Sequence, residues 1–206
     1  MNTAEKENRN NGGSPDVSVW AAALRMRFCE KALKQMQKFM SNVIGTEWEM
    51  PVVLAGMYGL RMSEIIGLRT TNIDLEKMQF SVVEQMPFKV PPGTKTITEM
   101  APTKSNDRIL PITEETLPYF LRQFDLIKRQ KELIAASGGV YYDNKLFIAK
   151  PDGSPQRRDR MSANYGQLIR HLEMPHIRFH DLRHPYVKHT KNIFLKKQKY
   201  QAINRF

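Results

Sequence analysis

Two short β-like runs set within long helix-like patterns constrain the fold of this chain more than any other feature. Residues 79–83 and 108–112 are rich in β-branched and aromatic side chains, which favour pleated strands. A long connection separates the two runs, and the Pro-Pro-Gly sequence of residues 91–93 marks a turn within it. We expect the two runs to pair as antiparallel neighbours in one small sheet.

Helical patterns fill most of the remaining chain. Apolar residues recur at helix-like spacings along residues 19–44, and a second apolar run covers residues 50–58. Two more helices are expected at residues 114–136 and 162–172. The sequence therefore predicts an α+β domain that is mainly α-helical and carries a small antiparallel β-sheet.

Shorter elements complete the expected fold. Thr113 is a candidate N-cap for the helix at residues 114–136. Residues 145–148 are predicted to form a small strand, and His180 introduces a last helix. No repeat of fixed period occurs, which argues against a solenoid or a propeller.

Arg61 is expected in a tight connection between two helices. The apolar run at residues 50–58 precedes it, and Ser63 begins a short helix whose first turn contains Glu64. The Ser63 side chain can cap this helix, and the helix dipole stabilises a carboxylate in the first turn. Lys104 is expected near the start of the second β-like run.

The chain is predicted to contain one domain between two tails. Residues 1–16 are polar and Asn-rich, so we expect a disordered tail that cannot bury enough apolar surface to fold. Residues 17–184 form the domain, and an apolar content of 41% over the whole chain is enough for one core. Residues 185–206 form a basic C-terminal tail.

The charge favours nucleic acid as the partner. The chain carries 32 Lys and Arg against 21 Asp and Glu, a net charge of +11, and basic side chains release counterions from a phosphate backbone. No apolar stretch is long enough to span a bilayer, so no membrane partner is expected. The single cysteine, Cys29, excludes an internal disulfide and suits a reducing compartment, so we predict a cytoplasmic location.

Three short motifs occur in a fixed order along this basic chain. Residues 59–64 read Gly-Leu-Arg-Met-Ser-Glu, residues 103–105 read Thr-Lys-Ser, and residues 180–184 read His-Asp-Leu-Arg-His. The ordered series resembles the catalytic domain of the tyrosine recombinases, the phage-integrase family of phages and conjugative transposons. The resemblance implies a bacterial or phage-borne protein that acts on double-stranded DNA, with other recombinase protomers as possible partners.

The resemblance implies a role for each motif residue. Arg61 and Arg183 would hold the non-bridging oxygens of the scissile phosphate, because guanidinium groups match phosphate geometry and stay charged. Lys104 would protonate the departing 5′-oxygen, which needs a titratable proton. His180 would assist proton transfer or hydrogen-bond the phosphate. The resemblance further implies two carboxylates that orient these cations, Glu64 and Asp181.

A metal site is the competing interpretation of the histidines. His176, His180 and His184 recur at a spacing of four residues, so an uninterrupted helix would bring them to one face. Pro185 argues against such a helix, and no Cys or carboxylate pair completes a ligand set. We expect no metal and no cofactor.

The tyrosine nucleophile of the family has no counterpart at the family's spacing. It would lie beyond Phe206, and Tyr186 and Tyr200 both follow Arg183 too closely. Tyr200 is expected to be a solvated or DNA-contacting residue of the basic tail. The sequence therefore predicts a catalytic-domain fragment of a site-specific recombinase or integrase that binds DNA through a phosphate-clamping basic cleft, with strand cleavage lost or severely impaired.

Two other functions compete with this one. A non-catalytic DNA-binding regulator, or a partner of an intact recombinase, would use the same domain without cleaving DNA. A basic RNA-binding domain is favoured only by the charge, because the chain has neither an aromatic RNP-like strand nor a Gly-x-x-Gly clamp loop in a suitable setting.

Overall fold

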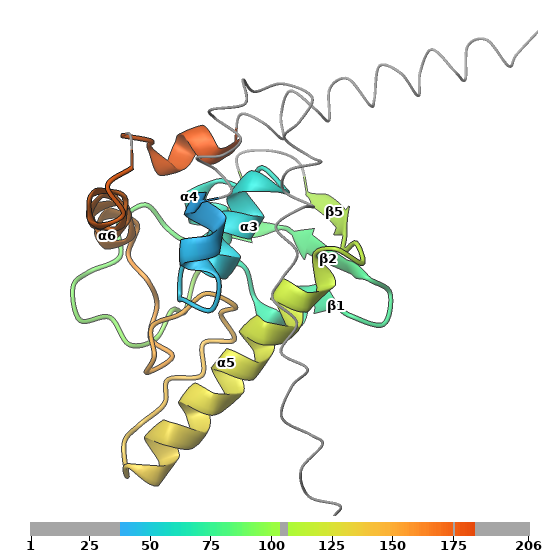
Figure 1. The fold of residues 1–206 in the computed structure, drawn as a ribbon. Helices are drawn as coiled ribbons and strands as arrows, with labels where there is room; N and C mark the ends of the chain where they lie inside the picture. The colour runs from blue at the N-terminus through green and yellow to red at the C-terminus, as the bar shows by residue number, and fades with distance from the viewer. Residues whose placement is uncertain (1–37, 104–106, 175, 184–206) are drawn as a thin grey trace, which may run out of the picture.

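A computed structural model describes residues 38–103, 107–174 and 176–183 of the chain. Figure 1 shows a mainly helical domain with a small sheet at one side. The expected N-terminal tail, Lys104, and the C-terminal tail with Tyr200 lie outside the described residues. The predicted class, mainly α-helical α+β with a small antiparallel sheet, is confirmed.

The main sheet has three antiparallel strands in the order β1-β2-β5. The strands are β1 (Ile73–Asp74), β2 (Gln79–Val82) and β5 (Arg108–Pro111). Phe80 of β2 faces Leu110 of β5, so the pairing predicted for the two β-like runs is confirmed. Phe80 is buried while its neighbours along β2 are less so, the alternation of a sheet with one face on the core.

A second, two-stranded sheet connects the main sheet to the helices. It pairs β3 (Glu84–Gln85) with β4 (Ala101–Pro102), again antiparallel. The long connection with the Pro-Pro-Gly turn leaves β3 and returns at β4. The β3 strand lies against the helix α4 (Met62–Gly67), and Gly67 allows this close approach, because a Cβ there would lie 2.5 Å from the backbone nitrogen of Met86.

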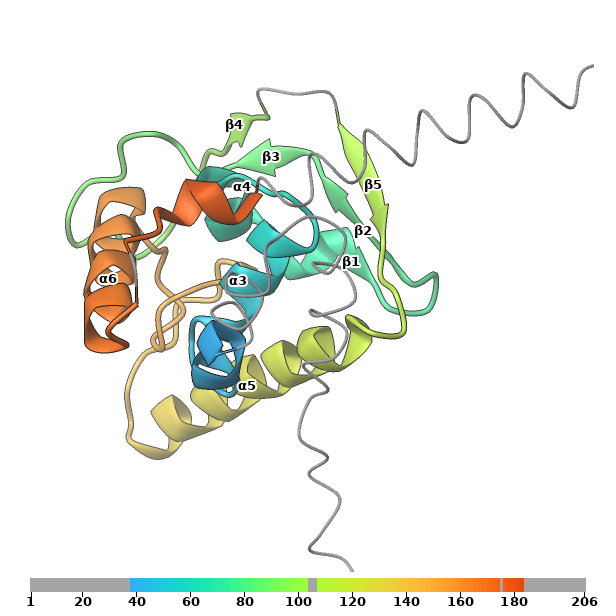
Figure 2. The same ribbon diagram turned by 45° about the horizontal axis from the view of Figure 1, so that its top comes forward.

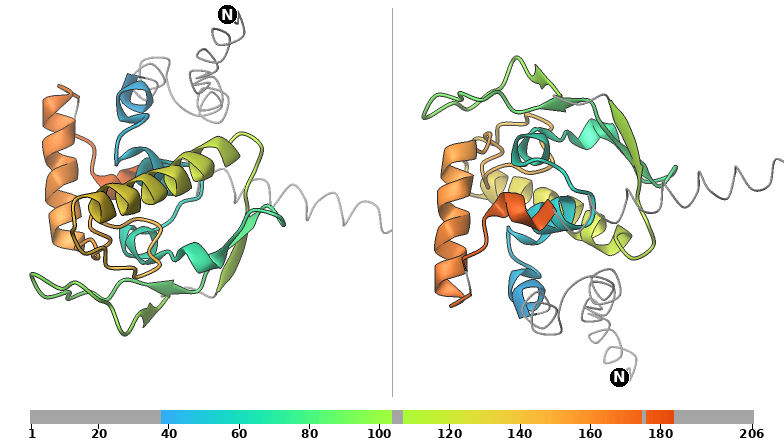
Figure 3. Two further views of the ribbon diagram at one scale, coloured as in Figure 1. Left: turned by 90° about the horizontal axis from the view of Figure 1, so that it is seen from below. Right: turned by 90° about the horizontal axis from the view of Figure 1, so that it is seen from above.

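Helix α3 (Glu49–Gly56) forms the centre of the domain. Seven of its eight residues are buried, as expected for a helix covered on all sides. It contacts α4, the long helix α5 (Leu117–Ala136), and the 3-10 helix η2 (Phe179–Arg183). Figure 2 shows α3 between these elements, and both views of Figure 3 place α6 (Arg158–His171) and the three-stranded sheet on opposite sides.

Two groups of aromatic side chains fill the core. One group joins the end of α3 to the sheet and to α5, with ring centroids 5.0 to 6.2 Å apart among Tyr58, Phe80, Phe120 and Phe147. The other group joins α3, α6 and η2 through Trp48, Tyr165 and Phe179, with Phe39 against Tyr165. The second group fixes η2, and with it the His-Asp-Leu-Arg motif, against the centre of the domain.

Two predictions of local structure were wrong. Helix α5 begins at Leu117 rather than at residue 114, and its N-cap is Thr116 rather than Thr113. The Thr116 hydroxyl bonds the backbone N–H and the carbonyl of Thr113, which closes a turn before the helix. Residues 145–148 form no strand: only Leu146 makes an isolated bridge, to Arg69. Backbone hydrogen bonds join this loop to residues 68–70, and the buried amide of Asn144 ties the neighbouring loops together.

Two other predicted helices can be compared with the structure. The helix expected within residues 19–44 is described at residues 38–43, and α6 begins four residues before the predicted Ser162. None of the helices in the described ranges combines the length and the apolar character needed to cross a membrane.

Candidate functional site

Arg61 is the residue that begins helix α4. Its backbone is extended, with φ −74° and ψ 151°, and it is the N-cap of a helix that starts at Met62. Glu64 accepts a hydrogen bond from the Arg61 backbone N–H at 2.7 Å and one from Arg61 Nη1 at 2.8 Å. The prediction that Ser63 caps this helix was wrong, because the Ser63 hydroxyl donates to Gln85 of β3 instead.

Glu64 is a fully buried carboxylate shared by two arginines. Its Oε2 lies 2.9 Å from Nη2 of Arg108, the first residue of β5, and its side chain has no exposed surface. Burial raises the pKa of the Glu64 carboxyl, but the hydrogen bonds from Arg61 together with the charge of Arg108 outweigh burial and hold this pKa below its ordinary value. Glu64 is therefore an anion at neutral pH.

Arg183 reaches the same place from the other end of the chain. Its Nε donates a hydrogen bond of 2.7 Å to the carbonyl oxygen of Gly59, which lies 124 positions earlier. Gly59 lies in the turn between α3 and Arg61 and has a positive φ of 67°, a conformation that favours glycine. The buried side chains of Phe179 and Leu182 hold η2 in position.

The charge of Arg183 is coupled to those around it. Burial lowers the pKa of its guanidinium, the charges of Arg61 and Arg108 lower this pKa further, and Glu64 opposes them. An arginine stays protonated at any working pH, so Arg61, Arg108 and Arg183 place three positive charges against the one carboxylate of Glu64. A bound anion would offset the excess positive charge.

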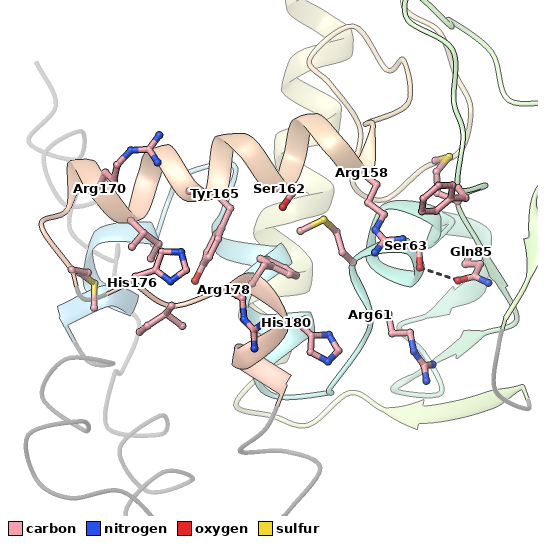
Figure 4. A pocket seen from close by; sticks show the side chains of 18 of the residues that line it. Arg61, Ser63, Gln85, Arg158, Ser162, Tyr165, Arg170, His176, Arg178 and His180 are labelled. Carbon is pink, nitrogen blue, oxygen red and sulfur yellow. Dashed lines mark hydrogen bonds between the residues drawn. The ribbon is translucent and has the colours of Figure 1, made fainter.

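A pocket of about 800 Å³ opens beside these residues. Figure 4 shows it between α6, α4 and η2, with Arg61 and His180 on neighbouring walls. Its walls are partly apolar, and its polar side chains include Arg158, Arg170 and Arg178, while no Asp or Glu lines it among the described residues. The pocket is therefore positively charged.

The predicted site residues are brought together in part. Arg61, Glu64 and Arg183 meet around one turn of chain, and His180 lines the adjoining pocket. Lys104 lies outside the described residues. Asp181 accepts three hydrogen bonds from Arg178, from its backbone N–H, its Nε and its Nη2. Asp181 therefore orients Arg178, which was not among the predicted site residues.

Two residues of the site were missed by the sequence analysis. Arg108 was predicted only as part of a strand, and no spacing in the sequence relates it to Glu64. Tyr165 lies in the pocket wall with its hydroxyl buried and without a hydrogen-bond partner among the described residues. Burial, and to a lesser degree the charge of Asp181, raise the pKa of Tyr165. The helical spacing of Met161, Tyr165 and Ile169 indicates a buried face but not this hydroxyl.

Within the described ranges, no three His, Cys, Asp or Glu side chains lie close enough to hold a metal ion. His184, the third member of the histidine series, lies outside those ranges. The chemistry available at the described site is that of fixed cations, one buried carboxylate and an imidazole. Such a site binds and polarises an anionic oxygen group such as a phosphate.

Comparison with known proteins identifies the family. The profile of the phage integrase family matches residues 27–192, most of this sequence and all three motifs. The chain belongs to this family, and its fold is that of the tyrosine recombinase catalytic domain.

Individual relatives are more distant. A tyrosine recombinase XerC-like protein of Caldanaerobacter subterraneus is 26% identical over 162 residues, which are 74% of this chain and 41% of that protein. The Tn1549 transposon integrase, solved with transposon right end DNA, superposes with a TM-score of 0.60 at 22% identity, covering 78% of this chain and 52% of that one. A second structure of this integrase, with circular intermediate DNA, gives 0.59 at 20% identity over 85% and 64%. The sequence thus spans less than half of the curated relative.

Proposed function

We propose that this domain is the phosphate-binding part of a site-specific recombinase or integrase and that it clamps one backbone phosphate of double-stranded DNA between Arg61 and Arg183. The observation that carries the proposal is the hydrogen bond from Arg183 to Gly59, which brings the second motif beside the first. The residual positive charge around Arg183 supports an anionic ligand. The DNA in the structures of the Tn1549 integrase supports the nature of this ligand.

The remaining motif residues take the roles that the family implies. Lys104 protonates the departing 5′-oxygen, and His180, on the wall of the pocket, assists proton transfer or holds a phosphate oxygen. Fixed guanidinium groups then meet the charge that develops on the phosphorane-like transition state. Residues 17–184 form the functional domain in this proposal, and it acts in the cytoplasm, where DNA is accessible.

A salt titration of DNA binding tests the clamp. The variant with Arg61→Ala and Arg183→Ala is compared with one carrying Lys77→Ala and Lys128→Ala, whose lysines are 73% and 76% exposed. The clamp predicts weaker binding for the arginine variant and a slope of log K against log salt that is smaller by roughly 2, about one for each lost phosphate contact. Equal losses from the two pairs would show that binding depends on bulk charge alone.

We further propose that the 206 residues of this sequence do not cleave DNA by themselves, because none of their tyrosines lies at the family's spacing from Arg183. A nicked suicide duplex tests this directly, since strand cleavage traps a covalent 3′-phosphotyrosyl adduct. The expected result is DNA binding without an adduct. An efficient adduct through Tyr200 would overturn this part of the proposal and leave the clamp intact.

A second function, a partner that completes its site with an intact recombinase, is favoured by the pocket. The pocket adjoins Arg61 and His180 and has room for a tyrosine-bearing segment of another protomer. Mixing this chain with a recombinase that keeps its tyrosine but lacks its first arginine tests the idea. Restored cleavage, or inhibition of an unmodified recombinase, supports the partner role, and no effect of either kind refutes it.

A further inference from the structure

Three arginines from three separate elements interact with the buried carboxylate of Glu64, Arg61 and Arg108 by direct contact and Arg183 through its charge. Arg61 precedes α4, Arg183 ends η2, and Arg108 begins β5. Only Arg108 belongs to none of the sequence motifs. Its partner in the sheet is Val82 of β2, so the register of the sheet fixes where its side chain begins.

The two oxygens of Glu64 divide these contacts unequally. Oε1 accepts the hydrogen bond from Arg61 Nη1. Oε2 accepts from the Arg61 backbone N–H, and Arg108 Nη2 lies 2.9 Å from this same oxygen. The terminal torsion of a glutamate is soft, so the plane of the carboxylate is set by its donors. Arg108 is the cation that contacts the carboxylate from outside α4 and its cap.

The side chain of Arg108 is itself well placed for this task. Its Nε and Nη2 are shielded from solvent and neither makes a hydrogen bond of good geometry among the described residues, so the contact of Nη2 with Glu64 is an ion pair. The contact also joins the main sheet to α4, and so links the strand that follows the Thr-Lys-Ser motif to the helix that follows Arg61.

We propose that Arg108 is a positioning residue of the recombinase site, which fixes the plane of the Glu64 carboxylate and thereby aims the Arg61 guanidinium at the DNA phosphate. The proposal rests on the proposed phosphate clamp and assigns the role to a residue outside the motifs. Arg108 does not touch the phosphate in this proposal. Its effect on DNA is transmitted through Glu64 to Arg61.

The lowered pKa of Glu64 supports this arrangement. The charge of Arg108 is among its causes, so Arg108 also helps to keep Glu64 ionised. The charged groups that face Glu64 from the described elements are Arg61, Arg108 and Arg183, each a cation. Among the described residues, loss of Arg108 would leave Arg61 as the side chain in direct contact with the carboxylate.

A double-mutant cycle separates positioning from a direct or a purely structural role. DNA affinity is measured by fluorescence anisotropy for the unmodified chain, Arg108→Met, Arg61→Met and the double variant. We expect each single change to weaken binding by about tenfold, the size of one charge-assisted hydrogen bond. The double variant should bind no more than about twofold more weakly than Arg61→Met, because Arg108 acts only through Arg61.

Other results have distinct meanings. Additive losses, with a salt slope that falls in Arg108→Met even when Arg61 is already absent, would make Arg108 a direct phosphate ligand and overturn the proposal. If Arg61→Met binds DNA like the unmodified chain, the phosphate clamp itself fails. If Arg61→Met weakens binding and Arg108→Met does not, only the positioning role fails.

A matched control removes the effect of stability. Arg122 of α5 pairs with the buried carboxylate of Glu49 at 2.6 Å, so Arg122→Met removes a similar ion pair that includes no motif residue. It should lower the melting temperature without changing DNA affinity. Arg108→Lys, which keeps the charge and loses the planar fork, should restore less than half of the lost affinity. Should Arg108→Met fail to fold, the cycle is run with Arg108→Lys, and additivity there overturns the proposal.

Discussion

Replacement of Glu64 by Gln tests how much of the site depends on one buried carboxylate. Gln has nearly the same shape but offers only one acceptor oxygen, so its NH₂ group must face either Arg61 Nη1 or the two donors at Oε2. At least one charge-assisted hydrogen bond is lost and the others are weakened, which predicts a loss of about 3 kcal/mol in the free energy of unfolding. For a chain of this size the melting temperature should fall by roughly 6–12 °C.

The measurement is urea unfolding followed by far-UV circular dichroism, with DNA affinity measured in parallel. Glu49→Gln is the control, since Glu49 is also a buried carboxylate and accepts hydrogen bonds from Arg122. Both variants should lose stability, but only Glu64→Gln should lose DNA affinity as well. Equal DNA affinity in the two variants would refute the link between Glu64 and the phosphate site.

The pH dependence gives a second test of the Glu64→Gln variant. The pKa of Glu64 in the folded protein lies below its ordinary value of 4.5. Its stabilising contribution is therefore complete above that value and is lost as the pH falls through the folded pKa. The difference in stability between the unmodified chain and Glu64→Gln should narrow below about pH 4.5. A difference under about 1 kcal/mol at neutral pH, or one that stays constant on acidification, would refute the reasoning.

Three further changes probe how the scaffold holds the site. Gly67→Ala places a Cβ 2.5 Å from the backbone nitrogen of Met86 and should lower stability by about 2–3 kcal/mol in thermal unfolding. Asn144→Ala removes an amide that donates to three backbone carbonyls, so it should cost about 3 kcal/mol and speed limited proteolysis of the connection between β3 and β4. Burial raises the pKa of Asp152, but hydrogen bonds from Lys95 and Ser154 outweigh it and hold this pKa at about 2. The ionised Asp152 thus stabilises the fold fully above pH 3.8, its ordinary pKa, and this stabilisation is lost as the pH falls towards 2. Asp152→Asn should therefore flatten the dependence of unfolding free energy on pH in that range.

The spacing of apolar residues was enough to predict the helices and strands that bury one face. The strands β2 and β5 alternate, and α6 repeats its apolar residues at helical spacing, so their existence could be predicted from the sequence alone. Pattern failed at element boundaries, where several residues compete to cap one helix. Ser63 and Thr113 both have capping side chains, yet the carboxylate of Glu64 accepts the hydrogen bond at the start of α4, and α5 begins after Thr116 without a side-chain cap.

The site was predictable to the extent that its residues lie in motifs. Arg61 and Arg183 were found because their neighbours in the sequence resemble those of a known family, and the structure brings them to one turn. Arg108 was not found, because its contact with Glu64 depends on how β5 is placed against α4. Such placement follows from the packing of the whole domain and leaves no trace in the spacing of residues along the chain.

The anchor of Arg183 is a main-chain oxygen, and this has a consequence for comparing relatives. Every amino acid supplies a carbonyl, so substitution at position 59 removes the contact only by altering the turn, whose positive φ favours glycine. An analysis of covarying residues would therefore overlook this link between the motif at residues 59–64 and the motif at residues 180–184. A change in the backbone torsions of Gly59, caused by a substitution elsewhere in the turn, would misdirect Arg183 although every motif residue stays the same.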